Sequence, residues 1–302
     1  MDNMRGIILM VIGMLGFATE DMFIKLTAEG LPVGQIMAVL GFSGAVVFAG
    51  YATLRGTNVF SMGFFHPAVV LRNICEMLGG LCFVTALTQI PLATVTTILQ
   101  ATPLLVTMGA ALVLGEAVGW RRWTAILVGF FGVLLVIRPG LEGFEPAALW
   151  AVLSVIGLAI RDLASRKVPQ TISSLQLSAW AFFASGVSGV VLLAFTGGAK
   201  MPTNSETFYL SGALIVGVIA YWTLTEATRI GDISVVTPFR YARLVFSTII
   251  GMLVFNEFPD AFTLIGACII IATGIYTILR ERKRRREAAV QVAAASSAGT
   301  VL

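Results

Sequence analysis

The sequence predicts an all-α integral membrane protein of ten transmembrane helices, arranged as two five-helix inverted repeats. Three observations lead to this fold class. Of the 302 residues, 57% are hydrophobic and only 12% are charged, against roughly 25% charged residues in a soluble domain. Apolar segments of about 20 residues, the length that crosses a bilayer, recur along the chain. A shift of 141 residues aligns the first half of the sequence with the second.

The ten expected helices are apolar stretches bounded by Pro, Gly or charged residues. The first stretch has no small-residue cleavage site, so we expect a permanent span and not a removed signal. The tail at 283–302 lacks periodicity, and we expect it to be disordered and cytoplasmic. In chain order, the expected spans are 5–27, 33–54, 67–89, 92–114, 121–138, 146–166, 173–196, 207–229, 233–255 and 260–280.

The distribution of Lys and Arg sets the expected orientation. With the N-terminus inside, the inner segments hold 14 basic residues and the outer segments hold 3. The positive-inside rule therefore places both termini in the cytoplasm of a multi-pass protein, which we assign to a bacterial inner membrane. The basic run 280–286 directly follows the last apolar segment. We interpret it as a membrane anchor and expect no nucleic-acid partner.

An internal repeat is the most specific signal in the sequence. The shift of 141 residues aligns Gly16–Asp21 with Gly157–Asp162. Chance is an unlikely source of such matches, because they occur at one shift across four helices. The same shift aligns Lys25 with Arg166, Gln35 with Gln176, Ala38 with Ala179 and Glu116 with Glu257.

Each half holds five spans, an odd number, so the two halves must have opposite orientations in the membrane. Inverted repeats of this kind are typical of secondary transporters. The predicted domains are therefore a first repeat at 1–140, a second repeat at 141–282 and the tail at 283–302.

One hairpin carries a family resemblance. Residues 101–116 end in a Gly-Glu turn, and Trp120–Trp123 and Gly129–Gly132 follow before Arg138-Pro-Gly140. Together with the five-plus-five helices, this segment resembles the drug/metabolite transporter superfamily, EamA type, over about residues 5–282. The second copy departs from the pattern, with Asn256 in place of the Gly.

The resemblance implies a secondary transporter that moves a small organic metabolite by alternating access without ATP. Amino-acid derivatives and heteroaromatic vitamins such as riboflavin both lie within the family's range. It also implies a central cavity between the halves and no catalytic residues. We expect a small-molecule substrate, the lipid bilayer and a coupling proton as partners, a monomer or homodimer, and neither cofactor nor metal.

Polar side chains near the bilayer midplane are the candidate substrate site, because charge in hydrocarbon is costly. At a rise of about 1.5 Å per residue, three polar residues lie about 13 Å from the start of their helices, near the midplane: Glu76, Gln100 and Arg240. Arg243 shares a face with Arg240 by its i,i+3 spacing. Two pairings of Glu76 are open: with Arg240 across helices, or with Arg72 at i,i+4. The second pairing leaves Arg240 to face an anionic group.

Trp222 and Glu226 are further substrate-binding candidates near the inner end of the eighth span. A carboxylate beside an aromatic ring suits a cationic or aromatic substrate. The alternative for Trp222 is an ordinary place in the aromatic belt at the membrane interface. Glu76 or Glu226 is the candidate carrier of a coupling proton, since burial favours a protonated carboxyl group.

Four residues are candidates for gating or coupling. Glu20 and Asp21 fall in the outer quarter of the first span, and the repeat aligns them with Arg161 and Asp162 in the inner quarter of the sixth. One interpretation is a pair of symmetry-related gates. The other is local pairing, such as Asp21 with Lys25 at i,i+4, and snorkelling to the interface.

Two prolines predict breaks inside spans. Pro103 and Pro238 each follow a Thr, in the fourth and ninth spans. An interior Pro removes a backbone hydrogen bond and kinks the helix. Where such a break faces a cavity, the freed carbonyl groups can bind a ligand.

Two rival functions are weighed against transport. The segments 41–44 and 186–189 both match the G-x-S-G of intramembrane serine proteases, but a Ser nucleophile needs a base and the chain has one His, His66. An ion channel is disfavoured because no ring of like charge is visible. We therefore predict a transporter and not an enzyme.

Overall fold

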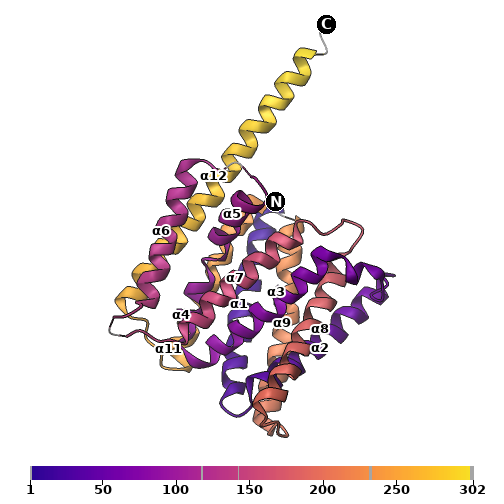
Figure 1. Cartoon of the computed structure of the whole chain (residues 1–302), viewed down its shortest axis with the longest axis vertical. Helices are drawn as coiled ribbons and strands as arrows, with labels where there is room; N and C mark the ends of the chain where they lie inside the picture. The colour runs from indigo at the N-terminus through magenta and orange to yellow at the C-terminus, as the bar shows by residue number, and fades with distance from the viewer. Residues whose placement is uncertain (1, 117, 142, 231–232, 300–302) are drawn as a thin grey trace.

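The computed structural model describes residues 2–299 except 117, 142 and 231–232. That part of the chain is helical and contains no strand. Most of the helices run side by side, and the last one extends well beyond the body of the molecule (Figure 1). In chain order the elements are α1 (Asp2–Ala28), α2 (Val33–Leu54), η1 (Met62–Phe65), α3 (Pro67–Gln89), α4 (Leu92–Leu99), α5 (Thr102–Val113), α6 (Trp120–Ile137), α7 (Ala148–Ser165), α8 (Ser174–Thr196), α9 (Asn204–Ile230), α10 (Ile233–Val236), η2 (Thr237–Tyr241), α11 (Ala242–Val254) and α12 (Ala261–Gly299).

Nine helical segments in the described residues are long and apolar enough to cross a membrane, with α4 and α5 counted together. They correspond to nine of the ten predicted spans. The remaining predicted span, 233–255, is divided into α10, η2 and α11. The predicted span 92–114 is also interrupted, at Gln100 and Ala101 between α4 and α5. The chain is therefore a multi-pass membrane protein in which two equivalent segments are broken.

Both predicted helix breaks occur next to their prolines. Pro103 is the second residue of α5, and Pro238 is the second residue of η2. Because Pro has no amide hydrogen, the carbonyl group of Leu99 loses its usual helical donor. The hydroxyl group of Thr102 donates to that carbonyl oxygen at 2.6 Å. The break after α4 is thus stabilised locally by the Thr that precedes the proline.

The C-terminal tail differs from the prediction. We expected disorder over 283–302, but α12 continues as one helix to Gly299; residues 300–302 lie outside the described residues. Ala and Arg, which have high helix propensity, make up nine of the 20 residues of the tail. The preceding span also supplies a helix already formed, so the extension needs no new nucleation.

Packing between the two halves is symmetric. The long contacts join α1 to α9, α3 to α7, α2 to α8 and α6 to α12, and Figure 1 shows the last two pairs at opposite edges. The repeat makes α1 equivalent to α7 and α3 equivalent to α9, so the α1–α9 pair corresponds to the α7–α3 pair. The α2–α8 and α6–α12 pairs each join two equivalent helices. Small residues permit the close approach. A Cβ atom on Gly16 would lie 2.8 Å from Ala220, and one on its repeat counterpart Gly157 would lie 2.9 Å from Gly79.

The two G-x-S-G segments lie in the contact between α2 and α8. Gly41 packs directly against the backbone of Gly186, and Gly34 packs against Gly189. His66 caps the N-terminus of α3, where its Nδ1 accepts a hydrogen bond from the Ala68 amide at 3.3 Å. The glycines of these segments therefore serve close helix packing.

Candidate substrate cavity

A cavity of about 1330 Å³ lies between the two halves. Side chains from α1, α3, α4, α5, α7, α8, α9, η2, α11 and α12 line it. It reaches the surface at Arg166, whose side chain is 40% exposed, and near Arg282. The C-terminal end of α7, directly before Arg166, lies at the end of the molecule where the N-terminus lies and α12 leaves the body (Figure 1).

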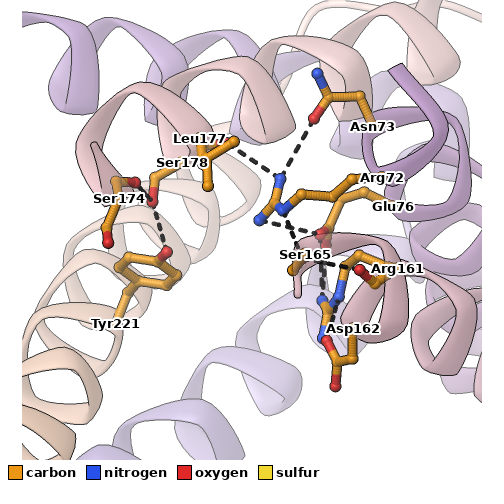
Figure 2. A network of polar contacts seen from close by, with 10 residues as sticks. All are labelled: Arg72, Asn73, Glu76, Arg161, Asp162, Ser165, Ser174, Leu177, Ser178 and Tyr221. Atoms are coloured by element: carbon orange, nitrogen blue, oxygen red, sulfur yellow. Dashed lines mark hydrogen bonds and ion pairs between the residues drawn. The ribbon is translucent and has the colours of Figure 1, made fainter. Parts of the chain in front are cut away.

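A network of arginines and carboxylates forms one wall of this cavity (Figure 2). Nη1 of Arg161 on α7 lies 3.2 Å from both carboxylate oxygens of Glu76 on α3. The same guanidinium group binds Oδ1 of Asp162 through Nη2 at 2.7 Å and Nε at 2.9 Å. Arg72 lies 3.9 Å from Glu76 and donates to Ser165 at 3.1 Å. Arg161 is therefore the centre of the network.

The structure decides how Glu76 is paired. The predicted i,i+4 pair with Arg72 is confirmed, and the alternative pair with Arg240 is not formed. The reason is that α7 packs along α3 and brings Arg161 to Glu76. Arg240 lines the cavity in the 3-10 helix η2, where its carbonyl oxygen accepts a hydrogen bond from Gln100 at 3.3 Å.

Arg243 lines the cavity too, but an acidic group satisfies it. Its Nη2 lies 2.8 and 2.7 Å from Oδ1 and Oδ2 of Asp21, and its Nε lies 3.1 Å from Oδ2. The guanidinium group also lies 5.3 Å from the ring of Phe17 and 5.5 Å from that of Phe83. Asp21 is buried in this pair, so the local pair of Asp21 with Lys25 is not formed. Glu20 points away from the cavity lining and packs against Gly217 of α9.

A second wall is aromatic and hydroxylic. The hydroxyl groups of Ser178 on α8 and Tyr221 on α9 lie 2.5 Å apart. Phe182, one turn after Ser178, also lines the cavity and stacks on Phe48 with ring centroids 5.2 Å apart. Sequence reasoning missed these residues, because a Ser, Tyr or Phe within an apolar helix gives no sign of which neighbour it faces.

Trp222 and Glu226 are not among the residues that line the cavity. Tyr221, Leu224 and Thr228 are the α9 residues that line the cavity. Their spacing of three and four residues defines one helix face. Trp222 and Glu226 share a different face, and the side chain of Trp222 is exposed on the outer surface of the molecule. An aromatic-belt position therefore describes Trp222 better than a place in the cavity.

Beyond the deep end of the cavity, an ion pair ties three parts of the chain together. Nζ of Lys25 lies 2.6 Å from Oε1 of Glu257 and donates to the carbonyl oxygen of Ile90 at 2.8 Å. Oε2 of Glu257 accepts from the amide of Leu92 at 2.8 Å. The two charged side chains are 13% and 20% exposed. The pair closes the molecule at the end of α1, opposite the cavity mouth.

The counterpart pair lies at the cavity mouth. Nη1 of Arg166 lies 2.8 Å from Oε1 of Glu116, and these side chains are 40% and 42% exposed. The two loops match in detail. The amide of Glu116 donates to Ala110 at 3.1 Å, and that of Glu257 donates to Gly251 at 2.9 Å. All of these positions are related by the repeat shift of 141 residues.

Comparison with known proteins agrees with this architecture. The sequence pattern of the EamA-like transporter family matches residues 4–138 and again 145–280. An S-adenosylmethionine uptake transporter of Rickettsia conorii is 28% identical over 283 residues, covering 93% of this chain and 94% of the relative. A riboflavin transporter of Vibrio cholerae is 30% identical over 230 residues, covering 72% of this chain and 74% of the relative. A solved crystal structure with 19% identity superposes with a TM-score of 0.60, covering 89% of this chain and 98% of the other, which shows the shared fold.

Proposed function

The chain belongs to the EamA-like transporter family, and from this premise we propose that it carries a small, carboxylate-bearing organic metabolite across the bacterial inner membrane. The membrane orientation is the predicted one, with both termini in the cytoplasm. On that orientation the cavity mouth at Arg166 faces the cytoplasm. The Lys25–Glu257 pair then closes the periplasmic side.

Alternating access between two inverted five-helix halves is the proposed mechanism. The exchange symmetry of the helix pairs supports it, since the same contacts recur when the halves are swapped. The two counterpart ion pairs support it as well, because one lies at each end of the molecule. In this mechanism the broken segments α4–α5 and α10–α11 allow local movement without unfolding a span. Proton coupling and the choice of monomer or homodimer stay predictions from the sequence.

Arg240 is the residue from which we infer a carboxylate-bearing substrate. Four cavity-lining arginines each lie within 4 Å of a carboxylate: Arg72, Arg161, Arg166 and Arg243. Arg240 makes no ion pair within the described residues. A guanidinium group that faces a cavity selects a carboxylate or phosphate, which it binds through two hydrogen bonds. Gln100, whose amide holds the backbone of Arg240, is a positioning residue in this scheme.

Two relatives transport compounds of the two classes expected from the sequence, which supports testing both classes here. S-adenosylmethionine is an amino-acid derivative, and riboflavin is a heteroaromatic vitamin. Both carry a flat nitrogen heterocycle, for which the wall of Phe182 and Tyr221 offers aromatic faces. Labelled S-adenosylmethionine, which has a carboxylate, is therefore the first compound to test, and riboflavin, which has none, is the comparison compound.

The experiment is uptake of both compounds into proteoliposomes, preceded by a thermal-shift screen, because a ligand that binds the folded state raises its melting point. We expect Arg240→Ala to insert normally and to lose transport of S-adenosylmethionine by about 100-fold or more, since it removes the charge-assisted bidentate contact to the carboxylate. Arg55→Gln, at an exposed position after α2, is the matched control and should transport at the normal rate. Normal transport by Arg240→Ala would overturn the assignment.

A further inference from the structure

The polar network leaves one free acceptor beside the cavity. Both oxygens of Glu76 are engaged by Arg161. Asp162 differs, because Arg161 binds its Oδ1 atom twice, through Nη2 and Nε. Within the part of the chain that the structure describes, Oδ2 of Asp162 accepts no hydrogen bond, and the side chain is 36% exposed. Figure 2 shows this second oxygen turned away from Arg161.

Arg240, on η2, faces the same cavity. Arg240 is exposed to the cavity and has no carboxylate partner among the described residues. Asp162 lies within electrostatic reach of it, on the side of the cavity formed by α7. Both residues line the cavity. An unmatched guanidinium group and an unmatched carboxylate oxygen therefore face one space.

We propose that Arg240 and Asp162 form a two-point clamp for an α-amino-carboxylate head group. This inference rests on the proposed function and deepens it by naming the substrate class. Arg240 binds the carboxylate of the substrate, and Oδ2 of Asp162 accepts a hydrogen bond from its ammonium group. A carboxylate without the amine would face the negative oxygen of Asp162 with nothing to compensate it. An amine without the carboxylate would leave Arg240 unpaired.

The size of the cavity indicates that the amino-acid substrate bears a bulky side group. About 1330 Å³ exceeds the roughly 300–1,000 Å³ of usual small-molecule sites. Ser178 and Tyr221 lie across from the charged network (Figure 2), and Phe182 stands beside them in the cavity lining. The head group occupies the clamp, and the rest of the substrate extends toward these hydroxyl groups and rings. A charged head group and a large, partly aromatic side group together define the class.

The test uses matched compounds that differ only in the head group. Tryptophan, indole-3-propionate and tryptamine form one such set, and S-adenosylmethionine with decarboxylated S-adenosylmethionine forms another. Binding to the purified protein is measured by thermal shift and isothermal titration, together with riboflavin. For at least one set, we expect the parent compound to bind about 10- to 100-fold more tightly than the forms that lack the amine or the carboxylate.

Variants separate the clamp from the proposed function. Asp162→Asn keeps an acceptor for Arg161, and we expect it to bind the parent compound about tenfold or more weakly while its affinity for the amine-free compound holds or rises. Glu76→Gln is the control for a disturbed network, and it should leave the ratio between the two compounds unchanged. Arg240→Gln should weaken both compounds.

Each outcome bears on the clamp. Equal losses for both compounds in Asp162→Asn would overturn it, as would a wild-type protein that binds the truncated compounds as well as the parents. If an amine-free carboxylate is carried and no α-amino acid is, the clamp falls and the proposal of a carboxylate transporter stands. If riboflavin, which has no carboxylate, is the only compound carried, both fall. If no compound in the panel binds, both fall.

Discussion

The two ends of the cavity carry the same pair of charges in very different surroundings. At the closed end, Lys25 and Glu257 are 13% and 20% exposed; at the open end, Arg166 and Glu116 are 40% and 42% exposed. The positions are related by one sequence shift, and the preceding helices end with the same backbone hydrogen bonds. Chemistry and local structure are therefore shared, and only the environment differs.

The environment of the closed end adds contacts that the ion pair alone does not provide. Lys25 also binds the carbonyl oxygen of Ile90, and Glu257 also binds the amide of Leu92. These two backbone groups flank Pro91 in the connection between α3 and α4. The closed end thus joins α1, the α3–α4 connection and the loop before α12. The open end joins only the end of α7 to the loop after α5.

This difference indicates which end of the molecule contributes more to the stability of the present conformation. Hydrogen bonds to charged groups that are shielded from water contribute about 1.5–3 kcal/mol each. An exposed ion pair contributes about 0–1 kcal/mol. The contacts at Lys25 and Glu257 therefore dominate the preference for closure at their end of the molecule, and the pair at Arg166 contributes little while it is exposed.

The largest expected effect follows from Glu257→Gln. The amide side chain can still accept from Leu92, but it leaves the ammonium group of Lys25 shielded and without a counter-charge. We expect the closed end to open about 10- to 100-fold more often. The measurement is the labelling rate of a cavity cysteine, Leu99→Cys, by an impermeant thiol reagent added from the periplasmic side, with Cys75, Cys82 and Cys268 replaced.

A charge exchange is the control for this experiment. The double variant Lys25→Glu with Glu257→Lys restores opposite charges at the same site. Labelling of the Leu99→Cys reporter should return toward the slow rate of the parent protein. An unchanged labelling rate in Glu257→Gln would show that other contacts close this end.

Glu116→Gln is expected to have a smaller effect. The exposed pair with Arg166 is solvated in the present state, so its loss costs about 1 kcal/mol at most. We expect cytoplasmic labelling of Leu99→Cys to stay within about fivefold of the parent rate. A change in labelling as large as that of Glu257→Gln would mean that the two pairs contribute equally to the present state.

The sequence predicted the spans well and the ion pairs poorly, for a physical reason. Apolar length between Pro, Gly and charge determines where a helix can cross a bilayer. The predicted limits of α2 and α3 therefore match the structure to the residue. Self-comparison also aligned Lys25 with Arg166 and Glu116 with Glu257. It could not show that the aligned positions meet across the halves, because alignment reports equivalence and not proximity.

The candidate site was predicted in part for the same reason. Depth along a helix identified Arg240, Glu76, Gln100 and Arg243, all of which line the cavity. Depth assigned Arg161 to a gate, although it is the centre of the charged wall, because α7 crosses α3 near the mouth. Depth along a helix also does not show which face of the helix points to the cavity. For this reason Trp222 was predicted in the site and Tyr221 was not.

The smallest expected effect concerns the loops that carry the two glutamates. Gly115 and Asn256 occupy equivalent positions with φ of 68° and 54°. Asn tolerates this left-handed conformation because its short polar side chain can hydrogen-bond locally. Asn256→Gly has two opposing effects on stability. Glycine relieves the residual backbone strain of the folded state, but it also gives the unfolded chain more conformational freedom, which destabilises the fold by about 0.4–1 kcal/mol. The two contributions nearly cancel, so we expect a melting temperature within about 2 °C of the parent protein in detergent.

Asn256→Val is the matched contrast at the same position. A β-branched residue in the left-handed region costs roughly 1–2 kcal/mol or more, which corresponds to a fall of about 2–8 °C for a domain of this size. Gly115→Asn should be tolerated in the same way as the natural Asn256. If Asn256→Val melts with the parent protein, the left-handed turn does not constrain the loop. The left-handed turn would then not be the cause of the matching geometry around Glu116 and Glu257. The difference between the two ends would have to come from the packing of α3 and α4 alone.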